Sequence, residues 1–226
     1  HRDYSLLGRV RVLVDDAGLT IANPGGFVEG INVHNLLTAE PRGRNPCLMD
    51  ALKRTGLAER TGRGIDRIFE GALNYGRPLP DYSRSNRRGV SVLLPRSVPD
   101  KAFVELLAEE RERSGKSMSL DGLLILDKLK SERRCGFDVL SGSLDMSDQR
   151  LRTVLGQLTE AGLVESAGVG ARRTYMLGAK VYRRSGRAME YVRQSDIDRV
   201  RYPELIIELM HEQKSVSKND VMELLH

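Results

Sequence analysis

The stretch LTEAGLVESAGVGARRTYML, residues 158–177, decides the fold of the second half of the chain. Its first residue ends a segment whose apolar positions have the i, i+3, i+4, i+7 spacing of one helical face, namely Leu151, Val154, Leu155 and Leu158. Ser147-Asp148 offers an N-cap for this segment, and Gly162 suits its C-terminal end. The pattern therefore predicts a helix that ends at Ala161-Gly162.

Two short apolar runs, 163–165 and 174–177, follow this helix and surround a Gly-rich turn. Upstream, a first helix with apolar positions Leu123, Leu124, Leu126 and Leu129 stops at Cys135-Gly136, and a short second element covers 137–144. The order helix, helix, helix, strand, turn, strand resembles the winged-helix family. In that resemblance AGLV leads into the first wing strand and TYML begins the return strand.

The third helix of this unit has the polar face that DNA recognition requires. In a helix-turn-helix protein the last helix lies in the major groove, where arginine can bind guanine and glutamine can bind adenine. At the wing tip, Arg172 and Arg173 would reach the backbone or the minor groove of double-stranded DNA. An adaptor role through protein contacts is the alternative. The outward-facing residues of the helix are Gln149, Arg150, Arg152, Thr153 and Gln157.

The distribution of charge favours a nucleic-acid partner. The chain has a formal net charge of +5, and residues 1–99 alone hold 15 Lys/Arg against 10 Asp/Glu. Residues 100–226 hold 21 of each sign, yet 147–187 hold 8 basic and 3 acidic residues. A concentrated basic stretch is typical of a DNA-binding surface, although a solvated basic face would look the same.

Residues 1–96 have the pattern of an α+β unit. The alternating run 9–14 and the apolar run 19–22 flank the turn sequence Asp15–Gly18, which predicts a hairpin. A helix is expected from Asn45-Pro46 to Gly56, with proline in its first turn. A second helix, from about Gly64, carries one apolar face, and a last strand follows at 89–94. The apolar face consists of Ile65, Ile68, Phe69 and Leu73.

Four motifs in this unit resemble one bacterial family. They are HRDYS at 1–5, IANPGG at 21–26, RNP at 44–46 and ERTGRGI at 59–65. The family is labelled as the C-terminal domain of a RecG-type ATP-dependent DNA helicase. The resemblance implies a diverged GHKL ATPase-like α/β sandwich, incomplete at its N-terminus. In the family an AlbA- or Schlafen-type DNA-binding domain usually precedes this domain, and winged helices follow it.

The resemblance also implies a nucleotide site with ATP as the cofactor. It places Asn23, Gly25 and Gly26 at the adenine loop, although the family's aspartate is missing there, and Thr61, Gly62 and Gly64 at a second glycine loop before a helix. The residues themselves favour the other interpretation, in which these glycines form tight turns before helices and no cofactor is required. No G-x-x-x-x-G-K-[ST] loop is present, so we do not expect helicase activity.

These features predict four segments: the RecG-like α+β domain at 1–96, a linker with a helical first part at 97–118, a winged helix at 119–184, and a second, truncated winged helix at 185–226. The two cysteines and four histidines are scattered, so no metal site and no catalytic residue is expected. No run of about 18 apolar residues suggests a membrane span. We expect a piece of a longer cytoplasmic protein.

The sequence supports three hypotheses about function. The first is a homodimeric transcriptional regulator, whose winged helix binds DNA while the N-terminal unit senses a ligand or dimerises. The second is a diverged nucleotide-binding enzyme in which the winged helices assist assembly. The third is a defence or stress scaffold that acts through protein contacts.

Overall fold

The computed structural model describes residues 2–58 and 63–184 of the chain. The chain forms two compact units, which divide between Lys101 and Ala102. Both helix and sheet are present, as the predicted α+β class requires. Among the described residues, no helix is long and apolar enough to cross a membrane. The truncated winged helix predicted at 185–226 lies outside the described residues.

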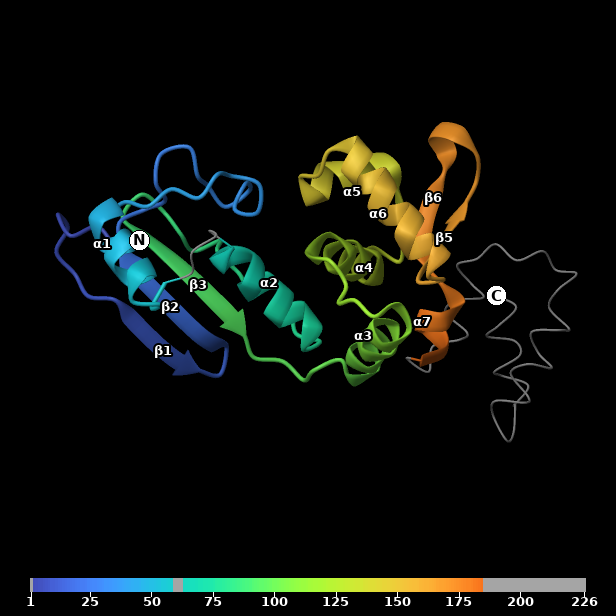
Figure 1. Cartoon of the computed structure of the whole chain (residues 1–226), viewed down its shortest axis with the longest axis horizontal. Helices are drawn as coiled ribbons and strands as arrows, with labels where there is room; N and C mark the ends of the chain where they lie inside the picture. Colours follow the sequence, from blue (N-terminus) through green and yellow to red (C-terminus); the bar gives the residue numbers. More distant parts are fainter. Residues whose placement is uncertain (1, 59–62, 185–226) are drawn as a thin grey trace, which may run out of the picture. The chain divides into compact units, whose positions relative to one another are not determined.

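The first unit contains a three-stranded antiparallel sheet with the order β1-β2-β3 (Figure 1). The predicted hairpin is present, because β1 pairs with β2 from Asp15↔Gly18 to Arg11↔Ala22. Its turn is fixed by the Asp15 carboxylate, which accepts hydrogen bonds from the backbone N–H of Ala17 at 2.9 Å and of Gly18 at 3.2 Å. The strands are β1 (Arg11–Asp15), β2 (Gly18–Pro24) and β3 (Gly89–Pro95).

Two helices, α1 (Pro46–Arg54) and α2 (Gly64–Asn74), complete the first unit where the sequence places them. On α2, Leu73 is fully buried, and the ring of Phe69 stacks on Tyr82 with centroids 6.3 Å apart. Ile68 belongs to the predicted apolar face but stays 37% exposed. Helix α1 buries no residue completely, so this unit has a small core.

The second unit has the element order of a winged helix. Helix α4 is followed by a short strand, two helices and a strand pair, and the antiparallel sheet has the order β4-β6-β5. Strand β4 was not predicted; it pairs Cys135 with Tyr175, directly after Arg133 ends α4 in a positive-φ conformation. The elements are α4 (Leu120–Glu132), β4 (Arg134–Gly136), α5 (Phe137–Leu144), α6 (Asp148–Glu160), β5 (Val164–Ala167) and β6 (Thr174–Leu177).

Helix α3 (Lys101–Ser114) occupies much of the segment that the sequence suggested as a linker, and it packs into the second unit. Its Phe103, Leu106 and Leu107 side chains are buried. The Nζ atom of Lys130 on α4 lies 5.5 Å from the centroid of the Phe103 ring. The segment boundaries at 96, 118 and 184 remain predictions.

A buried carboxylate joins α3 to α7 (Ala179–Arg184), the last described helix. Glu110 is 6% exposed, accepts hydrogen bonds from Arg113, and lies 3.6 Å from the Lys180 ammonium. The hydrogen bond from Arg113 and the charges of both cations outweigh desolvation, so the pKa of Glu110 is lowered.

We expect Glu110→Gln to destabilise the chain by about 1–3 kcal/mol at neutral pH, since it removes a charged hydrogen-bond acceptor from two cations. The folded-state pKa of Glu110 is depressed, so its contribution is present above the unfolded pKa and is lost as pH falls through the folded one. Urea unfolding at neutral pH and at about pH 3 checks this. A difference from wild type that is equally large in acid would contradict it.

Candidate nucleic-acid interface

Helix α6 presents one polar and one apolar face, as a recognition helix must. Ser147 caps it, since the Ser147 hydroxyl accepts a hydrogen bond from the Arg150 backbone N–H at 3.4 Å. Its apolar residues Leu151, Val154, Leu155 and Leu158 are at most 7% exposed. The five polar residues assigned to DNA contact all lie on the exposed side: Gln149, Arg150, Arg152, Thr153 and Gln157.

Arg150 is engaged within the protein. Its Nε and Nη2 atoms donate to the two carboxylate oxygens of Asp121 on α4, at 2.5 and 2.8 Å. The Asp121 side chain is only 14% exposed, so the pair fastens the first turn of α6 to the first turn of α4. Two of the five N–H donors of this guanidinium are thereby used to position the helix. Asp121 lies 29 residues before Arg150, so the sequence pattern did not indicate this ion pair.

Other contacts also hold α6 in place. The guanidinium of Arg152 lies 4.3 Å from the centroid of the Phe137 ring on α5, and the Ser141 hydroxyl donates to Asp148 at 3.0 Å. The Thr153 hydroxyl donates to the Gln149 carbonyl at 2.9 Å. Within the described residues, the side-chain amides of Gln149 and Gln157 make no hydrogen bond, so they are the α6 groups most available to a ligand.

The wing tip is a tight turn that carries two arginines. A 3₁₀ turn spans Gly170–Arg172, and Gly168 has a φ of +84°. A Cβ added at Gly168 would lie 2.8 Å from the Arg172 carbonyl oxygen, so glycine is required for this close approach. Arg172 and Arg173 are exposed at the tip, as the sequence predicted.

Acidic residues outnumber basic ones in the helix-turn-helix segment. The helix-turn-helix segment 137–160 holds two arginines and four acidic residues: Asp138, Asp145, Asp148 and Glu160. With Arg150 paired to Asp121, Arg152 is the other basic residue on α6. Of the cations assigned to DNA contact, Arg152, Arg172 and Arg173 form no ion pair among the described residues.

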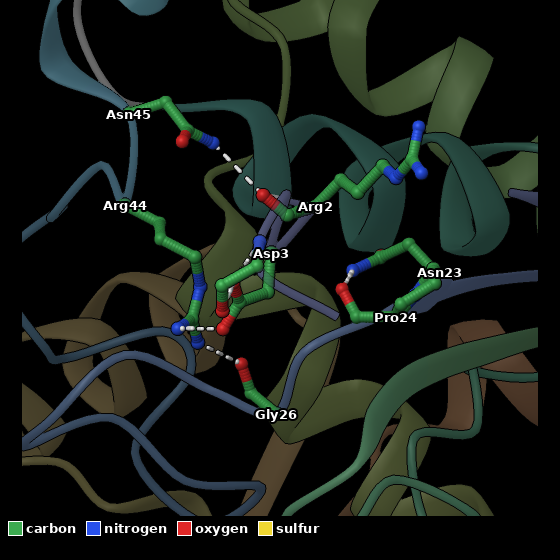
Figure 2. Close-up of polar contacts among 8 residues, drawn as sticks. Arg2, Asp3, Asn23, Pro24, Gly26, Arg44 and Asn45 are labelled. Atoms are coloured by element: carbon green, nitrogen blue, oxygen red, sulfur yellow. Dashed lines mark hydrogen bonds and ion pairs between the residues drawn. The ribbon is translucent and has the colours of Figure 1, made fainter. Parts of the chain in front are cut away.

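In the first unit, three of the four family motifs meet at Arg44 (Figure 2). The Arg44 Nη1 atom lies 2.9 Å from an Asp3 carboxylate oxygen, and its Nη2 atom donates to the Gly26 carbonyl at 2.7 Å. The Asn45 amide donates to the Arg2 carbonyl at 2.8 Å. Hydrogen bonds from Ser5, with a smaller effect of the Arg44 charge, lower the pKa of Asp3. Residues of these motifs thus form polar contacts that hold the N-terminal segment, the NPGG loop and the segment before α1 together.

The glycines assigned to the adenine loop face protein atoms. Gly25 has a φ of +97°, and a Cβ there would lie 2.5 Å from the Asp3 Cβ. A Cβ on Gly26 would lie 2.7 Å from the Asn86 carbonyl oxygen. Asn23 uses its amide locally, to donate to the Pro24 carbonyl at 3.2 Å. The geometry thus gives these residues a packing role, and nucleotide binding by them stays a prediction.

The second glycine loop is only partly described. Thr61 and Gly62 lie outside the described residues. Gly64 begins α2, and nothing lies within 4 Å of a Cβ added there. Among the described residues, no group of three His, Cys, Asp or Glu side chains is arranged to hold a metal ion.

We expect Gly25→Ala to lower the free energy of unfolding by at least about 1–3 kcal/mol, because the positive φ and the contact with Asp3 both penalise a Cβ. Gly64→Ala is the matched control and should be neutral or slightly stabilising, since its site is open. Thermal unfolding followed by circular dichroism compares the two. Equal midpoints would refute the packing role of Gly25.

The Asp121–Arg150 pair should behave as a stability element. Asp121→Asn and Arg150→Ala are each expected to destabilise the winged helix, and the double variant should lose less than the sum of the two by about 0.5–2 kcal/mol. Urea unfolding of the four proteins gives this coupling energy. Additive losses would mean that the pair does not hold α6.

Part of the chain matches a known protein family. Residues 8–94 match the family described as "Putative ATP-dependent DNA helicase recG C-terminal". The crystal structure of the DIP2311 protein from Corynebacterium diphtheriae is similar to the chain, with a TM-score of 0.66 and 24% identity over 81% of this chain. The chain spans 39% of the length of that protein.

A second solved structure, the oxidised form of MarR from E. coli, aligns with 57% of this chain and 90% of its own, at 16% identity and a TM-score of 0.29. No curated protein matches the chain significantly. The winged-helix assignment therefore depends on the order and pairing of the elements themselves. For the first unit the resemblance seen in the motifs is confirmed, because residues 8–94 match the model of the RecG C-terminal-like family.

Proposed function

We propose that the chain is a transcriptional-regulator-like protein that binds duplex DNA through its winged-helix unit. The observation that carries this proposal is the joint exposure of the α6 polar face and of the wing arginines on one module. A helix of this kind fits the major groove, and a basic wing reaches the neighbouring backbone.

The contacts within the unit suggest a different role in DNA binding for each group of residues. The side-chain amides of Gln149 and Gln157, which make no hydrogen bond in the described part of the chain, would bind base edges, while Arg172 and Arg173 would supply the phosphate contacts. Arg150 sets the position of α6 through Asp121 instead of touching DNA. Because phosphate contacts dominate affinity, most of the binding energy of this unit should come from its wing.

We assign the N-terminal unit to ligand sensing or dimerisation. A dimer suits this function, since two-fold symmetric proteins bind DNA sites whose halves are about one helical turn apart. A diverged nucleotide-binding role is the second candidate, favoured by the family match over residues 8–94. The close packing of Gly25 and Gly26 against protein atoms favours the regulator.

Fluorescence anisotropy with labelled duplex DNA, titrated between about 50 and 200 mM salt, tests the proposal. We expect Arg172→Ala/Arg173→Ala to reduce the slope of log K against log salt by about 2, because two phosphate contacts are lost. Gln149→Ala/Gln157→Ala should leave the slope unchanged and reduce discrimination between DNA sequences.

The matched control is Arg111→Ala/Lys116→Ala, which removes two exposed cations from the same unit on and beside α3. It should bind DNA as wild type does. If the wing variant binds no differently from this control, the wing does not contact DNA. In that case the winged helix is an adaptor for protein contacts.

A further inference from the structure

The loop before β3 in the first unit is a rigid hairpin tip. Asn86 and Gly89 exchange backbone hydrogen bonds, from Asn86 N–H to Gly89 O at 2.9 Å and from Gly89 N–H to Asn86 O at 3.3 Å. The Asn86 side chain accepts from the Arg88 N–H at 2.8 Å. The Ser85 hydroxyl bonds both the carbonyl and the N–H of Ser91, at 3.1 and 3.0 Å. The serine and asparagine side chains thus fix the backbone.

The arginines of this tip point to solvent. Arg87 and Arg88 are exposed and form no ion pair among the described residues. No acidic residue occurs from Tyr82 to Pro95. Asp81, just before this stretch, is occupied: its carboxylate accepts from the Ser83 N–H at 2.7 Å, and Ser83 and the Arg84 charge lower its pKa. The tip therefore carries uncompensated positive charge.

The tip is also fastened to the NPGG motif. The Gly25 N–H donates to the Arg88 carbonyl at 2.9 Å. Gly26 lies so close that an added Cβ would be 2.9 Å from the Arg87 carbonyl oxygen. The two arginine side chains thus start from a fixed backbone, which lowers the entropy lost when they bind a ligand.

A second pair of adjacent, exposed arginines, Arg172 and Arg173, lies at the 3₁₀ turn of the wing. Arginine forks suit phosphate oxygens, and two neighbouring arginines on a rigid turn suit a polyanion. We propose that Arg87 and Arg88 form a second phosphate-contacting site for duplex DNA, in the RecG-like unit. This inference takes its ligand from the proposed function but places the contact outside the winged helix.

The test uses the whole chain and the same labelled duplex. Arg87→Ala/Arg88→Ala should reduce the salt slope by about 2. Arg87→Gln/Arg88→Gln should do the same while keeping polar side chains, which separates loss of charge from loss of packing. Arg87→Lys/Arg88→Lys should keep most of the slope. The control Arg9→Ala/Arg54→Ala removes two exposed arginines from the same unit and should leave the slope unchanged.

The outcomes separate the two sites. If the tip variants match the Arg9/Arg54 control while the wing variant weakens binding, the second site is wrong and the proposed function stands. If the tip variants weaken binding and the wing variant does not, the RecG-like unit is the DNA-binding part and the winged-helix proposal is wrong. A wild-type chain that binds no duplex at 50 mM salt, about the lowest in the series, overturns both.

Discussion

The buried face of α4 is the element on which the second unit depends. Leu123, Ile125, Leu126 and Leu129 are completely buried there. Full burial of each such side chain contributes about 1.5–3 kcal/mol. Helices α5 and α6 and strands β4 and β6 all contact α4, so the position of α4 fixes both α6 and the sheet that carries the wing. The Asp121–Arg150 pair then sets the first turn of α6 against the first turn of α4.

The first unit is held by different means. Its core is small, and all five residues of β1 are exposed. In place of a wide apolar layer, one arginine ties the N-terminal segment to the NPGG loop, and glycines let backbone segments approach closely (Figure 2). Polar ties of this kind are directional, so they specify loop geometry more strictly than apolar contacts do.

The sequence predicted the elements whose signals are local. The stripe on α6, its serine cap, the wing turn and the β1–β2 hairpin each depend on residues close together in the chain. Strand β4 escaped prediction because it has three residues and exists only through its pairing with β6. The packing of α3 into the second unit was not predicted either, because its three buried apolar residues lie within a mostly charged sequence.

The candidate site was predictable as a set of exposed residues, but their partners were not. Asp121 is 29 residues from Arg150, and Asp3 is 41 residues from Arg44. No periodicity connects such pairs, because tertiary packing alone brings them together. For the same reason, the sequence could not decide whether the glycines of the NPGG motif form a tight turn or a nucleotide-binding loop. The close approach of Asp3 to Gly25 favours the tight turn.

The contact between Glu110 and Lys180 brings together α3, the first helix of the second unit, and α7, the last helix that the structure describes. Because α3 precedes α4 and α7 follows β6, this contact closes a loop of chain that contains every element of the helix-turn-helix and the wing. The entropy cost of closing a loop rises only slowly with its length, so a long-range contact of this kind costs little more to form than a short-range one. A single buried carboxylate thus links two helices that are far apart in the sequence.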